Sequence, residues 1–414
     1  MSFLSNFGKK NIISTFQEGY SPWPFLITTL CYGLTFGLTK GIMDNYLAEI
    51  ANVMEFERGV IEFCRELPGL FLIFILAAMY RNSDKKNYQI ALGIAMIGLS
   101  GLAFARSSKW IIVVFLVINS LGEHIVMQVR QSLSIEMAKP GKSGKSLGIM
   151  TGFRSLGRIT GFLLIPVFYL IFARFSLGRS DARSYKLIYL FALCITIIAF
   201  FLSTKIPEIK EKQSNAPIAK IYFNKKFGKY YVLSVFYGAR KQVFLTFAPY
   251  VLVLQYGASA SVMSMLFAIT AGMSIIFSPI IGRIIDRIGY RTVMIADTLI
   301  LIIVCFFYGF AHRLFPEHIA FYVVCSNYVF DSILSLCSMA SLVYIKDLAD
   351  NQKEVSQTIS SGISVNHLIS IIIALCGGLI WEKAGIELLF SLSALLGLIN
   401  SIVAATIPKT RKGL

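Results

Sequence analysis

Twelve apolar stretches, each about as long as a helix that crosses a lipid bilayer, follow one another along the chain. They lie at residues 24–49, 57–80, 87–106, 110–136, 147–172, 185–204, 230–255, 260–285, 292–311, 318–345, 355–381 and 386–407. A helix rises about 1.5 Å per residue, so about 20 apolar residues span a hydrocarbon layer of about 30 Å. The 414 residues therefore predict an all-α polytopic membrane protein with twelve transmembrane helices and no extramembrane catalytic domain.

The composition excludes an ordinary soluble enzyme. Charged residues make up 15% of the chain and hydrophobic residues 56%, whereas soluble proteins carry about 25% charged residues. The formal net charge of +17 would suggest a nucleic-acid partner in a soluble protein, but basic membrane loops explain it here, and we predict no nucleic-acid binding. Because the sequence contains neither HExxH nor GxSxG, we predict no enzymatic activity, no cofactor and no metal site.

The basic residues of the loops are concentrated on one side of the predicted spans. The two chain ends and the loops after even-numbered spans hold most of them, and the largest basic segment runs from Lys205 to Lys229. By the positive-inside rule this side is cytoplasmic. We therefore predict a multi-pass protein of the bacterial cytoplasmic (inner) membrane with both termini in the cytoplasm. Its predicted parts are a cytoplasmic N-tail (1–23), an N-terminal six-helix bundle (24–204), a basic cytoplasmic linker (205–229), a C-terminal six-helix bundle (230–407) and a cytoplasmic C-tail (408–414).

The two predicted bundles repeat one another. Asn119 and Glu123 in the fourth span correspond to Asn327 and Asp331 in the tenth, and the same offset, close to half the chain length, relates both pairs. This agreement with the span count and with the central basic linker indicates an internal duplication. The predicted fold is two pseudo-symmetric six-helix bundles.

The loop between the eighth and ninth spans carries a motif of known type. It contains, in order, Gly282, Asp286, Arg287, Gly289 and Arg291, and resembles the Gly-x-x-x-Asp-Arg-x-Gly-x-Arg loop of the major facilitator superfamily. The resemblance implies that this loop latches helix ends in one conformation and serves in gating. The equivalent loop of the first half, residues 79–87, lacks the pattern. An ordinary polar turn is the alternative interpretation.

Ionisable residues inside the apolar stretches are costly and mark functional sites. In the fold implied by the resemblance, helices 1, 4, 7 and 10 line the central cavity, and most of these residues fall on those helices or on the helices that flank the cavity. Residues near the middle of the bilayer form the predicted substrate site: Arg240, Lys241, Arg158, Arg130, Asp331 and His367. Cations outnumber carboxylates there, which favours a substrate with negative charge. Alternatively, Glu136 pairs with Arg130 or Arg154.

Three further groups of residues have predicted roles. Glu123, Asp331 and His124 are candidates for proton coupling, with Glu123 first, because a carboxyl group in low-dielectric surroundings binds a proton more readily. Asp297 is expected to pair with loop arginines. Helical spacing places charges on single faces of the first two spans, which predicts an outer ion-pair network, either gating or static: Lys40, Asp44, Glu62, Arg65 and Glu66. Gly152, Gly157 and Gly161 are expected to allow close helix packing.

These features predict a secondary active transporter. We expect it to move a small polar, anionic or zwitterionic organic solute by alternating access, coupled to protons. An exporter of amphipathic drugs or lipids is the alternative, because aromatic residues surround the basic pair of the seventh span: Phe236, Tyr237, Phe244 and Phe247. The expected partners are a small-molecule substrate, membrane lipid and H+, and the protein is predicted to be a monomer.

Overall fold

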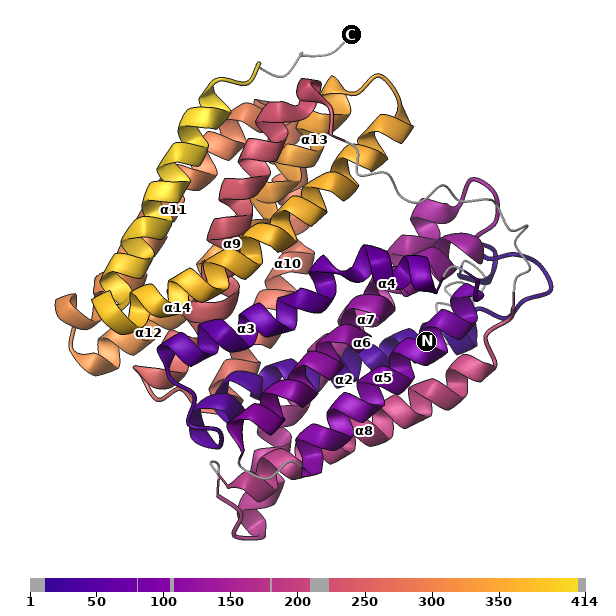
Figure 1. The fold of residues 1–414 in the computed structure, drawn as a ribbon, viewed down its shortest axis with the longest axis horizontal. Coiled ribbons are helices and arrows are strands. Elements are labelled where there is room, and N and C mark those ends of the chain that lie inside the picture. The colour runs from indigo at the N-terminus through magenta and orange to yellow at the C-terminus, as the bar shows by residue number, and fades with distance from the viewer. Residues whose placement is uncertain (1–11, 80, 105–107, 179–180, 209–222, 409–414) are drawn as a thin grey trace, which may run out of the picture. The chain divides into compact units, whose positions relative to one another are not determined.

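The computed structural model describes residues 12–79, 81–104, 108–178, 181–208 and 223–408 (Figure 1). These residues fold almost entirely into helices, with one isolated β-bridge between Phe16 and Ala138. The predicted all-α polytopic fold is confirmed. Much of the predicted linker, most of the C-tail and the first eleven residues lie outside the described residues.

The helices correspond to the predicted spans. They are α2 (Trp23–Glu49), α3 (Glu55–Leu70), α4 (Leu72–Ala78), α5 (Asp84–Phe104), α6 (Lys109–Glu136), α7 (Ser143–Arg174), α8 (Ala182–Thr204), η1 (Lys225–Phe227), α9 (Gly228–Leu254), α10 (Ala260–Ile288), α11 (Tyr290–Leu314), α12 (Glu317–Leu334), η2 (Ser335–Ser338), α13 (Met339–Leu348) and α14 (Gln352–Ala405). Within the described residues, nine spans are long and apolar enough to cross a membrane.

The other predicted spans do not each form one long apolar helix. The second predicted span is divided into α3 and α4, and α3 contains Pro68. The seventh corresponds to α9, which carries the basic residues Lys229, Arg240 and Lys241. The last two predicted spans form the single element α14, in which Gly385 has a φ of 83°. Because this backbone conformation is accessible mainly to glycine, Gly385 separates the two predicted helices.

Two compact units divide the chain. The first comprises Met1–Asn52, Phe71–Ile218 and Ala260–Ala268, and the second comprises Val53–Leu70, Ala219–Ser259 and Ile269–Leu414. The units therefore differ from the two sequence halves at α3 and at the beginning of α10. In the second unit α3 packs closely on α14, because a Cβ atom on Gly59 would lie only 2.3 Å from the carbonyl oxygen of Ala374.

In the first unit, glycines bring α2 and α7 into backbone contact. A Cβ atom on Gly37 would lie 2.2 Å from the carbonyl oxygen of Arg158, and one on Gly157 would lie 2.1 Å from that of Leu30. Small residues four positions apart allow such close approach between membrane helices. The predicted packing role is confirmed for Gly157 and Gly161, whereas a Cβ atom on Gly152 would meet no atom within 4 Å.

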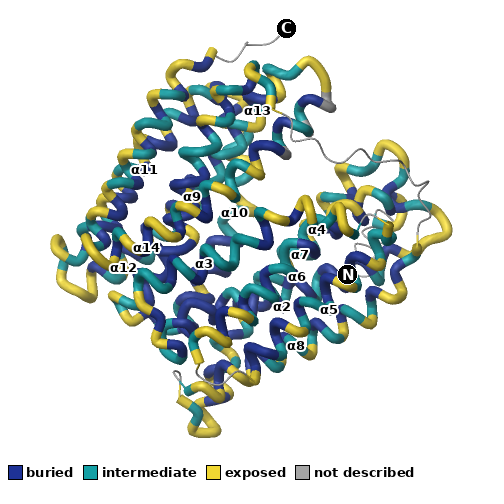
Figure 2. Tube along the Cα trace, in the orientation of Figure 1, coloured by how far each residue is buried: buried dark blue, intermediate teal, exposed yellow. Residues whose placement is uncertain are grey.

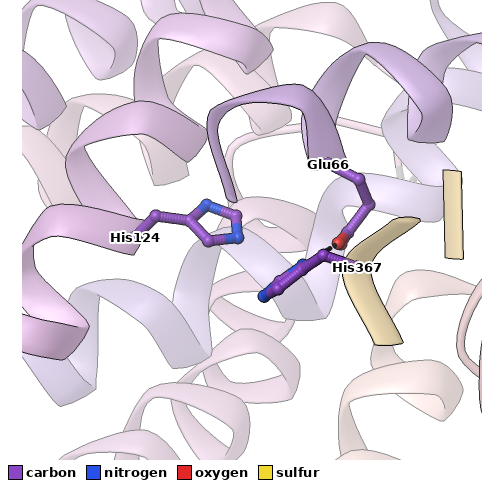
Figure 3. Close-up of side chains that lie close together, drawn as sticks. All are labelled: Glu66, His124 and His367. Carbon is purple, nitrogen blue, oxygen red and sulfur yellow. Dashed lines mark hydrogen bonds and ion pairs between the residues drawn. The ribbon is translucent and has the colours of Figure 1, made fainter. Parts of the chain in front are cut away.

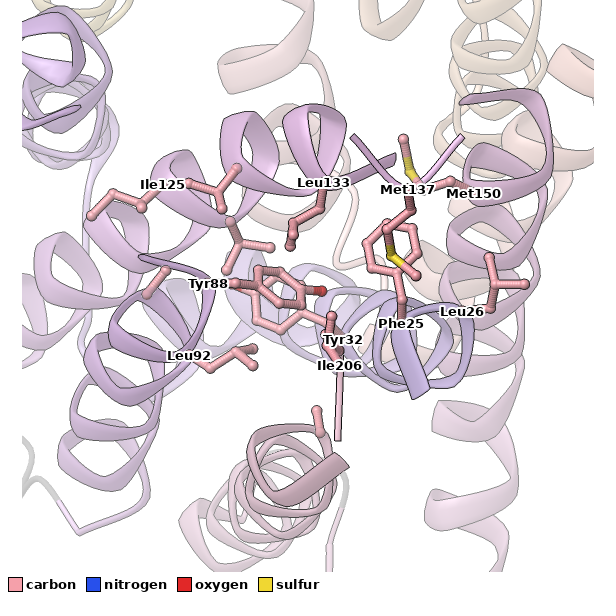
Figure 4. Close-up of a cluster of buried hydrophobic side chains, with 14 of the residues drawn as sticks. Phe25, Leu26, Tyr32, Tyr88, Leu92, Ile125, Leu133, Met137, Met150 and Ile206 are labelled. Carbon is pink, nitrogen blue, oxygen red and sulfur yellow. The ribbon is translucent and has the colours of Figure 1, made fainter. Parts of the chain in front are cut away.

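Apolar side chains fill the space between the helices and also cover their outer faces. Figure 4 shows part of the core of the first unit, built from α2, α5, α6 and α7 around Tyr32 and Tyr88. Buried and exposed residues alternate along the helices with helical periodicity (Figure 2). The exposed side chains include Phe74 and Leu170, which are 68% and 71% exposed. Such faces are suited to contact with lipid rather than water.

Lys226, which precedes α9, pairs with two acidic residues near the start of α14. Its Nζ lies 2.8 Å from Asp350 Oδ2 and 3.4 Å from Glu354 Oε2, in the segment where α14 begins. The hydrogen bond to Asp350, with the nearby charge of Glu354, raises the pKa of Lys226 above its ordinary value of 10.5. A second pair outside the spans joins Lys139 to Glu18, and it lowers the pKa of Glu18.

Lys226→Gln is expected to lower the melting temperature at neutral pH. Because the folded-state pKa of Lys226 is raised, its pairing contributes fully below the unfolded value and is lost as pH rises through the folded value. The melting temperatures of variant and native protein should therefore converge above pH 10.5. Lys225→Gln is the matched control, since Lys225 is exposed. Equal effects of the two substitutions at neutral pH would contradict the assignment.

Candidate functional site

Three arginines of the first unit lie together, with no acidic partner in the part of the chain that the structure describes. Arg130 on α6 is 3% exposed, and Arg154 and Arg158 on α7 are partly buried. Arg154 is close enough to the other two guanidinium groups to be repelled by both. Among the described residues no carboxylate lies within 4.0 Å of their side-chain nitrogens, and the Nε atoms of Arg130 and Arg158 have no hydrogen-bond partner.

Polar groups of α2, α5 and α6 border this cluster. Tyr32 interacts electrostatically with both Glu123 and Arg130, and Tyr88 with Arg130. Glu123 accepts a hydrogen bond of 2.8 Å from Asn119 Nδ2. Thus the carboxyl group of Glu123 accepts from an amide of its own helix. The pairing of Glu136 with Arg130 or Arg154 stays a prediction.

His124 is held by its own helix. Its Nδ1 lies 2.8 Å from the carbonyl oxygen of Ser120 and 3.3 Å from the hydroxyl oxygen of the same residue. Contacts of this kind, four positions apart, satisfy a histidine nitrogen locally. The proposed relay role of His124 stays a prediction.

In the second unit, Arg240 joins three helices. Its Nη1 on α9 donates to both carboxylate oxygens of Asp297 on α11, at 3.0 and 2.9 Å, and its Nη2 lies 3.6 Å from Asp331 Oδ1 on α12. All three side chains are buried. The prediction that Asp297 pairs with loop arginines is therefore wrong, because α9 brings a buried guanidinium closer. We call Arg240, Asp297 and Asp331 the α9 triad.

The neighbouring Lys241 is not part of this triad. Arg240 is 5% exposed, whereas Lys241 is exposed. Successive residues of a helix point about 100° apart, so the two basic side chains cannot reach the same group. Of the two basic residues predicted for the substrate site, Arg240 thus belongs to a buried ion pair, whereas Lys241 is an exposed cation.

The polar residues of α3 form two linked pairs within the second unit. Glu62 Oε2 accepts hydrogen bonds of 2.8 Å from Arg58 and from Arg65. Figure 3 shows the imidazole of His367 facing Glu66, with 3.0 Å between Nδ1 and Oε2. His367, predicted for the substrate site, therefore pairs with a residue of the predicted outer network.

Arg58 is a residue that the sequence interpretation missed. Its side chain is completely buried and lies over the ring of Tyr250, 5.5 Å from the centroid. The spacing of Arg58, Glu62 and Arg65, on one helical face, is the signal that could have revealed it. In the first unit, Lys40 and Asp44 form the expected pair at 3.3 Å.

Most of the predicted gating loop is helical in the structure. Gly282, Asp286 and Arg287 lie in the last turns of α10, and Arg291 lies in the first turn of α11, so that only Gly289 separates the two helices. Gly289 precedes α11 with a φ of 86°, which explains the glycine in the motif. Asp286 and Arg287 are exposed, while Gly282 and Arg291 are partly exposed. The charged groups of the motif are thus available at the surface of the second unit.

Sequence comparison identifies a family for nearly the whole chain. The family model described as Major Facilitator Superfamily matches residues 25–239 and again residues 230–413. Curated protein sequences give no significant match.

Solved structures share the fold at low sequence identity. A variant of the nucleoside transporter NupG is 15% identical, with 92% of this chain and 99% of that chain covered and a TM-score of 0.72. The D-xylose-proton symporter is 15% identical, with coverages of 94% and 99% and a TM-score of 0.72. The peptide transporter POT, in complex with sulfate, is 13% identical, with coverages of 96% and 98% and a TM-score of 0.68.

Proposed function

The chain belongs to the major facilitator superfamily, and we propose that it is a secondary active transporter of a small polar, anionic or zwitterionic organic solute. Alternating access, coupled to protons, moves the solute across the membrane. The observation that carries this proposal is the cluster of Arg130, Arg154 and Arg158, which lacks an ion-pair partner among the described residues. Cations buried without counter-ions are unfavourable, and an anionic solute supplies the missing charge.

The other solute contacts are proposed from position on the helices. Lys241 is exposed and able to approach a solute. In the second unit, His367 on α14 and Asp331 on α12 are proposed as further polar contacts of the solute, and Arg240 holds Asp331 in place.

Proton coupling is assigned to two matched carboxyl groups. Glu123 on α6 and Asp331 on α12 occupy equivalent places in the two repeats. In the α9 triad, two carboxylates share one guanidinium, so a proton on one of them balances the charge. The D-xylose-proton symporter, which has the same fold, supports this choice of coupling ion.

The outer ion pairs and the α10–α11 loop are assigned to conformational change. Lys40, Asp44, Glu62, Arg65 and Glu66 make charge pairs that alternating access has to rearrange, and the loop from Gly282 to Arg291 latches helix ends on the cytoplasmic side. Both termini are proposed to be cytoplasmic, in a bacterial inner-membrane protein that acts as a monomer. Membrane lipid surrounds it.

Asp286→Asn is expected to shift the balance between inward-facing and outward-facing states, because it removes the exposed charge of the latch. Double electron–electron resonance distances between spin labels at helix ends measure this balance. Thr292→Ala, a substitution of an exposed neighbour outside the motif, is the control. An unchanged distance distribution in Asp286→Asn would remove the loop from the gating mechanism.

Arg158→Gln is expected to reduce uptake of an anionic solute into proteoliposomes about tenfold or more, the scale of one lost charged hydrogen bond. Radiolabelled carboxylates, phosphate esters, amino acids and nucleosides form the test panel, with and without an imposed pH gradient. Arg174→Gln, at the exposed end of the same helix, should transport normally. Transport confined to cationic or lipid-like compounds, and unaffected by Arg158→Gln, would favour the exporter instead.

Aromatic packing gives the exporter less support. Phe244 lies in edge contact with Tyr308 and Phe390, and Phe247 packs against Trp381. Both phenylalanines are 5% exposed or less. Two of the four aromatic residues proposed for a drug cavity therefore fill helix contacts within the second unit, while Phe236 and Tyr237 are partly exposed.

A further inference from the structure

We infer that the solute of this transporter carries a doubly charged anionic group, a phosphate monoester or a pair of carboxylates, and that Arg130, Arg154 and Arg158 bind it. The inference rests on the proposed function and narrows its substrate class. It follows from the charge, the geometry and the rigidity of the cluster in the first unit.

The three positive charges of the cluster favour a solute with more than one negative charge. The guanidinium groups of Arg130 and Arg158 both lie within interacting distance of that of Arg154, and arginine stays protonated in proteins. The titratable groups that interact with Arg130 are Tyr32 and Tyr88. Tyr32 also interacts with Glu123, which accepts a hydrogen bond from Asn119. A solute with one negative charge would leave most of the repulsion in place, whereas a doubly charged group offsets most of it.

The geometry suits an anion with several oxygens. Arg154 and Arg158, four residues apart, share one face of α7, and their Cα atoms are about 6 Å apart along the axis. Arg130 approaches from α6 and has a buried Nε with no partner. Guanidinium groups bind carboxylate or phosphate oxygens in pairs. Donors from two helices therefore converge on one group with three or four acceptor oxygens.

The cluster is also held rigidly. Glycines of α2 lie against the carbonyl oxygens of Arg154 and Arg158, because Cβ atoms on Gly33 and Gly37 would lie 2.4 and 2.2 Å from them. The helix that presents two of the arginines is thus fixed by direct backbone contact. Preorganised donors lose less entropy on binding, which favours a tight and selective anion site.

The test compares the binding of solutes that are similar in size but differ in charge. It uses the full-length protein purified in detergent. Glycerol 3-phosphate and succinate probe the two kinds of doubly charged solute, and lactate and alanine are the singly charged and zwitterionic controls. Calorimetry and melting temperature should show binding of at least one doubly charged probe about tenfold or more tighter than either control. Preference for glycerol 3-phosphate identifies a phosphate monoester as substrate group, and preference for succinate identifies a dicarboxylate.

Changing the pH tests the charge directly for a phosphate ester. The second ionisation of a phosphate monoester lies near pH 6, so affinity for glycerol 3-phosphate should fall about tenfold between pH 7 and pH 5. Lactate or alanine binding as tightly as both doubly charged probes overturns the inference and leaves the proposed anion or zwitterion transport standing. Failure of all four probes, with no anion transport in proteoliposomes, overturns both.

Substitutions distinguish whether the three arginines bind an anion or only stabilise the fold. Arg154→Gln should weaken binding of the preferred probe about 10- to 100-fold, and it should raise the melting temperature of the ligand-free protein, because repulsion is relieved. Arg158→Lys should bind with intermediate affinity, and Arg174→Gln should bind as the native protein does. A lower melting temperature for Arg154→Gln with unchanged probe affinity would assign the cluster to structure instead.

Discussion

Replacing Arg240 by Gln is expected to lower the free energy of unfolding by about 3–5 kcal/mol, since breaking a buried ion pair leaves a charge uncompensated. In the native protein the guanidinium lies 2.9 Å from Asp297 and 3.6 Å from Asp331. The variant would leave two carboxylates facing each other in apolar surroundings. Melting temperature and denaturant unfolding of the detergent-purified protein measure the loss.

Two companion variants separate this effect from a loss of solute binding. Lys241→Gln changes the exposed neighbour and should melt as the native protein does. Adding Asp297→Asn and Asp331→Asn to Arg240→Gln removes the uncompensated charges and should recover most of the stability. If Arg240→Gln melted normally but no longer bound solute, Arg240 would belong to the substrate site rather than to a stabilising triad.

Gly37→Ala is the second substitution with a large expected effect. The new Cβ atom would lie 2.2 Å from the carbonyl oxygen of Arg158 and 3.0 Å from the Cα atom of Gly161. Both contacts are with backbone, so α2 and α7 have to separate, at a cost of about 1–3 kcal/mol or more. Because the displaced segment carries Arg158, anion binding should weaken together with the melting temperature.

Gly152→Ala is the matched control on α7. A Cβ atom there meets nothing within 4 Å, and alanine is favoured over glycine in a helix by up to about 1 kcal/mol. This variant should be as stable as the native protein or slightly more stable. If Gly37→Ala behaved in the same way, the close contact between α2 and α7 would not be required for folding.

The sequence predicted features that depend on local spacing. Hydrophobic length located the helices, and the pairs Lys40–Asp44 and Glu62–Arg65 followed from positions three or four residues apart on one helix. The packing role of Gly157 was predicted in the same way, from small residues at helical intervals. Each of these predictions needs only the geometry of a single helix.

Pairs between distant helices could not be predicted in this way. Arg240 bonds to Asp297 on α11, and His367 bonds to Glu66 on α3. The rotation of each helix about its axis decides such partners, and that rotation depends on the packing of the whole bundle. A sum of charges near the membrane centre therefore included Arg240 in the predicted cation excess. The structure instead pairs Arg240 with carboxylates and leaves the arginines of α6 and α7 without an ion-pair partner among the described residues.

The placement of α3 in the second unit makes each sequence half incomplete by itself. Arg58 is fully buried there, with its guanidinium over Tyr250, whose hydroxyl donates to the carbonyl oxygen of Val53 at 2.7 Å. In return, Phe267 from α10 packs on Phe162 in the first unit, with 5.5 Å between ring centroids. If the halves were synthesised separately, the N-terminal half would expose the charged face of α3 to lipid, and the C-terminal half would lack the helix that packs on α14, so the halves complete each other's folding.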